Sequence, residues 1–80
     1  MEFQPEKTYR MPNGALVTLQ GREMGWYQLG NTTDTWTVAP DGTVYEGLLT
    51  EGITNPYRAT GQATLWNAEQ IDDIDTQPAA

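Results

Sequence analysis

Two stretches of the chain, MPNGA at residues 11–15 and APDGT at residues 39–43, share one order of turn-forming residues. Proline presets φ near −65° at the second position of a type I turn, Asn or Asp suits the third, and Gly adopts the left-handed fourth. A type I turn followed by such a Gly is the three-residue loop of a bulged β-hairpin. Because hydrophobic runs flank both stretches, the sequence predicts two antiparallel hairpins.

The register that these turns impose separates apolar from polar side chains in both hairpins. Across the first turn Tyr9 lies opposite Val17, and across the second Val38 lies opposite Val44. Each hairpin then has one mostly apolar face, and a slip of one residue would mix the two faces. The hydrophobic pattern and the turn chemistry therefore predict the same pairing.

Further short strands are predicted outside the two hairpins. GWYQL at residues 25–29 has the composition of a strand, and YRATGQATLW at residues 57–66 predicts a third, looser hairpin around Gly61. Five or six short strands at this close spacing indicate an all-β fold, mostly antiparallel. We expect either a small barrel or a strongly bent sheet.

The pattern changes near the C-terminus. Asn67 can cap a helix, and the segment AEQIDDID at residues 68–75 has its two isoleucines three positions apart, so a short C-terminal helix is predicted. This helix would close the barrel. Residues 1–75 are expected to form a single small β-rich domain, and residues 76–80 a frayed tail.

The composition excludes several kinds of chemistry. The chain has no Cys, no His and no Ser, so disulfides, thiolate metal sites and the usual nucleophilic triads cannot form. Among the carboxylates, Glu46 stands on the apolar face of the second hairpin opposite Trp36, where an acid–base role is one interpretation and a place at the rim is the simpler one. The acidic segments lack the spacing of a calcium loop. We expect a protein that is not an enzyme and has no cofactor or metal site.

The charge balance restricts the partners. Eleven acidic residues against four basic ones give a net charge of −7, which disfavours direct binding to nucleic acid or to an anionic membrane. No apolar run approaches the ~20 residues of a membrane span, and the first ten residues contain no apolar signal segment. A cytoplasmic location is expected.

The acidic C-terminal segment is the first candidate for a binding function. It alternates apolar and acidic side chains, which could dock on a basic surface of a partner protein. The alternative is that the isoleucines close the barrel and the carboxylates keep the protein soluble. The candidate residues are Ile71, Asp72, Asp73, Ile74 and Asp75.

Aromatic residues are the second candidate. In GWYQL the adjacent Trp26 and Tyr27 must point to opposite faces of the strand, and the hairpin register turns Tyr45 outward. Tyr27 and Tyr45 are therefore added to the candidate partner-binding residues, because exposed rings supply rigid contact area.

These features favour one function over two alternatives. The leading hypothesis is a small acidic protein-interaction module, an accessory subunit or inhibitor of a partner with a basic surface. One alternative is a module that binds a small ligand or a carbohydrate through exposed Trp and Tyr. The other is a structural subunit whose exposed strand edges pair into a homo-oligomer.

Overall fold

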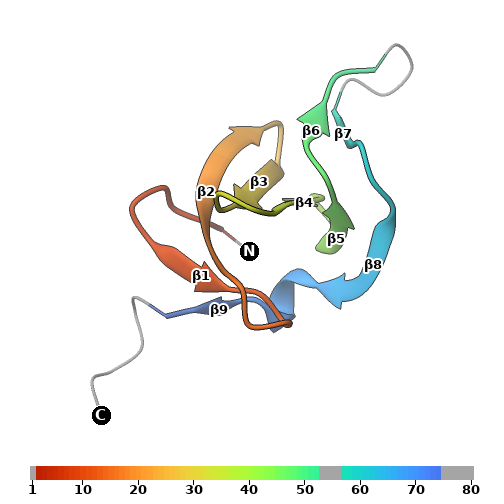
Figure 1. Cartoon of the computed structure of the whole chain (residues 1–80). Coiled ribbons are helices and arrows are strands. Elements are labelled where there is room, and N and C mark those ends of the chain that lie inside the picture. Colours follow the sequence, from red (N-terminus) through yellow and green to blue (C-terminus); the bar gives the residue numbers. More distant parts are fainter. Residues whose placement is uncertain (1, 53–56, 75–80) are drawn as a thin grey trace.

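The computed structural model describes residues 2–52 and 57–74 of the 80-residue chain, and it confirms the all-β, mostly antiparallel class (Figure 1). Within these residues seven strands form one sheet: β1 (Thr8–Arg10), β2 (Leu16–Glu23), β3 (Trp26–Gly30), β4 (Thr35–Val38), β5 (Thr43–Glu46), β8 (Ala63–Asn67) and β9 (Asp72–Asp73). A separate two-stranded ribbon consists of β6 (Leu49–Thr50) and β7 (Arg58–Ala59). The strand number is thus higher than the five or six expected.

The sheet curls into a half-barrel, and a short helical turn spans its opening. The strand order is β8-β5-β4-β3-β2-β1-β9, so the two edge strands are neighbours in the sequence. They are connected by the 3-10 helix η1 (Ala68–Gln70), which crosses from one edge of the sheet to the other (Figure 1). η1 therefore bridges the two edges of the half-barrel, and we call this connection the barrel closure.

Both predicted hairpins and their registers are confirmed. The pairs that define the two registers are Tyr9 with Val17 and Val38 with Val44. At each turn the expected glycine is left-handed, with φ of 91° at Gly14 and 95° at Gly42. Left-handed φ suits Gly because it has no Cβ, and this is the physical basis of the repeated turn phrase.

A third tight hairpin, between β2 and β3, was not predicted. Glu23 pairs with Trp26, and the two residues between them have positive φ, 52° at Met24 and 87° at Gly25. Positive φ at both central positions is the geometry of a type I′ hairpin turn. Met is uncommon in this conformation, so the sequence carried little sign of the turn.

The predicted hairpin within residues 57–66 is wrong. β7 pairs with β6 and β8 pairs with β5, so the two halves of that segment lie on different partners. Gly61 is not a turn residue between paired strands. Its α-carbon lies against the backbone of Glu46, and a Cβ at this position would collide with the Glu46 carbonyl oxygen.

The predicted helix over residues 68–75 is also wrong beyond its first turn. Asn67 caps η1 as expected, but the helix is only three residues long, and Asp72–Asp73 form strand β9 beside β1. Ile71 has extended backbone angles (φ −89°, ψ 123°) and packs against the core. Core burial of Ile71 and pairing with β1 outweigh helix propensity in a segment whose aspartates oppose the helix dipole. Asp75 and residues 76–80 lie outside the described residues.

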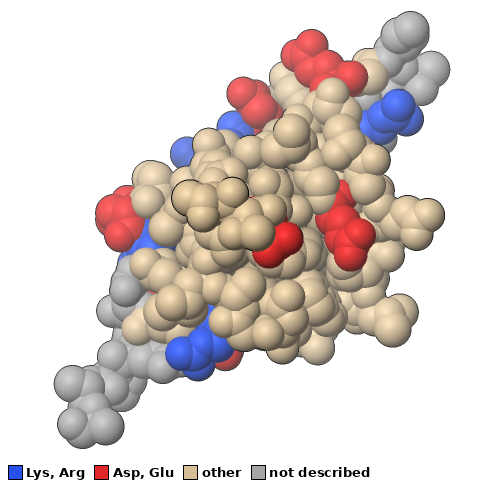
Figure 2. All heavy atoms as spheres, in the orientation of Figure 1, with Lys and Arg blue, Asp and Glu red and all other residues tan. Residues whose placement is uncertain are grey.

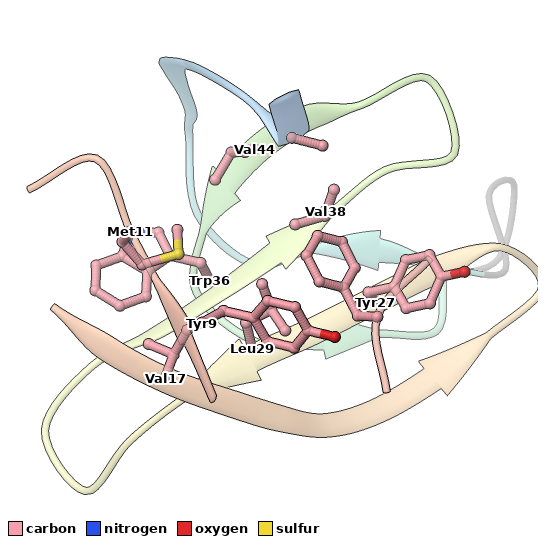
Figure 3. Packing of buried hydrophobic residues seen from close by; sticks show 10 residues of the cluster. Tyr9, Met11, Val17, Tyr27, Leu29, Trp36, Val38 and Val44 are labelled. Carbon is pink, nitrogen blue, oxygen red and sulfur yellow. The ribbon is translucent and has the colours of Figure 1, made fainter. Parts of the chain in front are cut away.

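The core occupies the inside of the curled sheet (Figure 3). Its buried residues are Phe3, Tyr9, Met11, Val17, Tyr27, Leu29, Trp36, Val38, Val44 and Ala68. Trp66 of β8 packs on this cluster, with its ring centroid 6.1 Å from that of Trp36. Within residues 2–52 and 57–74, no helix has the length and the apolar character that a membrane crossing needs.

Candidate functional site

A hollow of about 300 Å³ lies where the N-terminal segment meets the barrel closure. Its walls come from the N-terminal segment and the adjacent strand β1, and from the turn from η1 into β9, which is distant from both in the sequence. The lining residues are Glu2, Phe3, Tyr9, Ala68, Glu69, Ile71 and Asp73. We call this set the acidic hollow.

The floor of the acidic hollow is apolar and rigid. Phe3 is 4% exposed and Tyr9 is 3% exposed, and their rings pack edge to face with centroids 4.9 Å apart. The Tyr9 hydroxyl oxygen accepts a hydrogen bond from the Gln4 backbone N–H at 2.8 Å. This contact ties the N-terminal segment to β1, and it fixes the position of the neighbouring Phe3 ring.

The capping of η1 positions the opposite wall. The Asn67 side chain accepts a hydrogen bond from the Glu69 N–H at 3.1 Å, and the Gln70 side chain accepts one from the Asn67 N–H at 2.7 Å. This reciprocal capping box orders the turn. It leaves the Glu69 side chain exposed beside the hollow, and it directs Ile71 toward the core.

The rim of the acidic hollow is negatively charged. Glu2 and Glu69 are exposed, and Asp73 is half-buried. The Lys7 ammonium lies 3.1 Å from Asp73 Oδ2, so a cation of the chain itself contacts the rim. In the described part of the chain, no group of three His, Cys, Asp or Glu side chains has the arrangement of a metal site.

The structure brings together only some of the predicted partner-binding residues. Ile71 and Asp73 line the acidic hollow. Asp72 is exposed on β9 opposite Arg10, and Ile74 is half-buried, with its N–H donating to the Thr8 carbonyl at 3.3 Å. Asp75 lies outside the described residues.

The two predicted tyrosines lie elsewhere. Tyr27 is only 8% exposed and packs on Phe3, with ring centroids 5.1 Å apart, so its expected outward orientation is wrong. Its neighbour Trp26 takes the outer face instead. There its ring centroid lies 6.1 Å from that of Tyr45, whose side chain is half-buried. Burial of one ring under the N-terminal segment is a tertiary effect, and strand alternation alone could not decide which of the pair it covers.

Five residues of the hollow were not among the predicted site residues: Glu2, Phe3, Tyr9, Ala68 and Glu69. Glu2 and Phe3 belong to a segment with no regular secondary structure. Its only signal was a large apolar side chain among polar neighbours, which is typical of a residue that covers a core. Glu69 belonged to the predicted helix, and the sequence could not show that this residue lies beside the N-terminal segment of the chain.

A larger hollow has a different chemistry. It measures about 380 Å³ and lies along β1, β2 and the start of the β3–β4 loop. Its lining residues are Thr8, Leu16, Val17, Thr18, Gln20, Gly30, Asn31 and Thr32, none of which is charged or aromatic. The Trp26–Tyr45 pair is not among them. The Trp26–Tyr45 pair and this uncharged hollow therefore do not form a single site.

The edge strand β8 is irregular. Its pairing with β5 contains a bulge, in which Thr64 Oγ1 donates a hydrogen bond to the Val44 carbonyl at 2.8 Å and accepts one from the Trp66 N–H at 3.0 Å. Leu65 at this bulge is fully exposed. Bulges disrupt the regular row of donors and acceptors that a second chain would need for edge pairing.

Comparison of the chain with protein-family models, with curated proteins and with solved structures gave no match in any of the three. A fold class by itself does not imply a function. The function is therefore inferred from the acidic hollow and its chemistry.

Proposed function

We propose that the protein is a non-catalytic interaction module, an accessory subunit or inhibitor, that binds a partner protein with a basic surface through the acidic hollow. The observation that carries this proposal is the hollow itself, in which an apolar floor is surrounded by the carboxylates of Glu2, Glu69 and Asp73. A concave surface with an apolar base and a few convergent polar groups is the usual form of a binding site.

The overall charge supports the same partner. With a net charge of −7, the molecule attracts a basic surface at long range. This attraction raises the rate at which the protein associates with a basic partner. On the face seen in Figure 2 the carboxylates stand at separate points, several of them beside Lys or Arg side chains. An electrostatic field from scattered charges attracts a partner but does not orient it. A local feature such as the acidic hollow is needed to orient the partner.

Glu46, the one carboxylate considered for acid–base chemistry, supports no catalytic alternative. It pairs with Trp36 in the predicted register, and its side chain is exposed. An exposed carboxylate outside any of the hollows described above has neither the burial nor the enclosure that general acid–base catalysis exploits. The proposal therefore assigns binding and no reaction.

A defined basic probe tests the proposal. We would titrate the ¹⁵N-labelled full chain with a peptide of alternating Arg and Gly, and in parallel with its Glu–Gly counterpart, at low and at high ionic strength. Binding of the basic peptide alone, weakened by salt, is the expected result. Equal binding of both peptides, or no binding of either at low ionic strength, would overturn the proposal.

A further inference from the structure

Deepening the proposed function, on which it rests, we infer that the acidic hollow receives one long cationic side chain of the partner, an arginine or a lysine. Its aliphatic stem would lie over the apolar floor, and its charged head would lie at the rim between Glu2 and Glu69. The inference follows from the size of the hollow, from the order of its apolar and acidic parts, and from the hydrogen-bonding capacity of its carboxylates.

Size is the first constraint. A volume of about 300 Å³ lies at the lower limit of ligand pockets, which span ~300–1,000 Å³. It is too small for a helix or a hairpin of the partner. A single extended side chain fits such a volume, and the partner backbone stays outside.

The arrangement of the lining residues is the second constraint. Phe3 and Tyr9 lie at the buried base, Ile71 is half-buried, and Glu2 and Glu69 are exposed. Lys and Arg have the matching order, an apolar stem that ends in a charged group. A wholly apolar side chain would leave the rim carboxylates without a partner. An acidic side chain would be repelled by them.

The hydrogen-bonding capacity of the rim is the third constraint. Ionised carboxylates only accept hydrogen bonds, whereas guanidinium has five N–H donors and ammonium has three. Neither Glu2 nor Glu69 has an ion-pair partner among the described residues. A cation with several rotatable or branched N–H donors can therefore bind more than one of these carboxylates.

Lys7 is an internal example of the same recognition. Its ammonium group lies 3.1 Å from Asp73 Oδ2 at the edge of the hollow. Lys7 directly precedes β1, and Asp73 belongs to β9, which pairs with β1 on the side away from β2. The contact shows that the rim accommodates a primary ammonium group at hydrogen-bonding distance. Glu2 and Glu69 offer two further carboxylates for a cation from outside.

A series of capped five-residue peptides tests the inference. The peptides consist of glycine apart from the central residue, which is Arg, Lys, citrulline or Glu. Citrulline has the shape of Arg without its charge. We would titrate each into the ¹⁵N-labelled full chain and follow the signals of Phe3, Tyr9 and Ile71. We expect the Arg and Lys peptides to shift these signals. We expect the citrulline and Glu peptides to leave them unchanged.

A matched pair of variants locates the binding. Glu2→Gln with Glu69→Gln neutralises the rim, and Glu46→Gln with Glu51→Gln removes the same charge from exposed positions outside the hollow. The first double variant should bind the Arg peptide about fivefold more weakly, as expected for two exposed ion pairs. The second should bind within about twofold of the parent, since distant exposed charges are screened by salt. All four positions are exposed, so the fold should persist, and an unchanged spectrum without peptide would verify this.

Two results would overturn the inference. One is equal binding of the Arg and citrulline peptides. The other is an equal loss of affinity in both double variants. If the longer Arg–Gly peptide still binds when the Arg and citrulline peptides bind equally, the proposed function stands and only the insertion of a single charged side chain fails. An equal loss in both double variants would show that the hollow is not the binding site, and the proposed function would fail with the inference. If the longer peptide does not bind, the proposed function fails as well.

Discussion

The Lys7 ammonium group and the Asp73 carboxylate, 66 positions apart in the sequence, lie 3.1 Å from each other and join the N-terminal segment to the last strand of the sheet. β9 contains only two residues. A strand this short gains little from its ladder hydrogen bonds, so the ion pair and the packing of Ile71 add to its attachment.

A double-mutant cycle measures that attachment. Lys7→Met and Asp73→Asn should each lower the free energy of unfolding, with a coupling of about 0.5–1 kcal/mol, because the pair is partly exposed and screened. Urea unfolding of the parent, both single variants and the double variant gives the coupling. The coupling should shrink at high ionic strength. A coupling of zero at low ionic strength would show that the ion pair does not hold β9.

Asp41 provides a pH-dependent contribution to stability. Its pKa is lowered below the usual value of 3.8 by a hydrogen bond from the Thr43 backbone N–H, with a second from the Thr43 side chain. A carboxyl group whose pKa is lower in the folded state stabilises the fold above its unfolded pKa. That contribution is present at neutral pH and is lost as the pH falls below 3.8 through the folded pKa.

The expected observation is a ¹³C carboxyl titration of Asp41 with its midpoint below 3.8 in the folded protein. Asp41→Asn removes this ionisation, so its effect on stability should be larger at neutral pH than in acid. Asp34→Asn provides a control at another exposed loop aspartate. A midpoint for Asp41 at or above the usual value would contradict the role of the turn hydrogen bonds.

Thr37 tests a buried polar contact between the sheet and the loop before β6. Its side chain is fully buried, and Oγ1 donates a hydrogen bond to the Gly47 carbonyl at 2.8 Å. Thr37→Val has nearly the same shape but leaves that carbonyl without its donor, so we expect a loss of about 1–2 kcal/mol in the free energy of unfolding. Thr18→Val, at an exposed position of β2, should change it by less than about 0.5 kcal/mol. Equal effects of the two substitutions would rule out this hydrogen bond as a stabilising contact.

Two glycines make a matched comparison of close backbone approach. A methyl group at Gly61 would collide with the Glu46 carbonyl oxygen, whereas at Gly21 the nearest atom is Gln28 Cβ at 3.9 Å. Gly61→Ala should therefore cost about 1–3 kcal/mol, and Gly21→Ala should be close to neutral or slightly stabilising. Thermal unfolding of both variants checks this. A Gly61→Ala protein as stable as the parent would mean that β8 can move away from β5 at no cost.

The predictions that held rest on local chemistry. The turns at Gly14 and Gly42 need a left-handed residue, and they impose a register that the alternating apolar residues repeat. Capping of η1 by Asn67 is local in the same sense, because donor and acceptor are two or three residues apart. Interactions of such short range can be inferred from the residues that take part in them.

The failures involve choices between distant partners. β7 pairs with β6 and not with β8, and Asp72–Asp73 pair with β1 instead of extending η1. Both outcomes depend on which strand edge is free once the rest of the sheet has formed. No pattern within the segments themselves contains that information.

The acidic hollow shows the same division. The sequence alone determined the strong negative charge, the absence of His, Cys and Ser, and the two hairpins. It also indicated Ile71 and Asp73 as candidates for binding, and both line the hollow. Only the tertiary structure placed Glu2 and Phe3 beside them and turned Tyr27 into the core. The physical reason is that composition and turn chemistry act over a few residues, whereas the hollow exists only because barrel closure brings both ends of the described chain together.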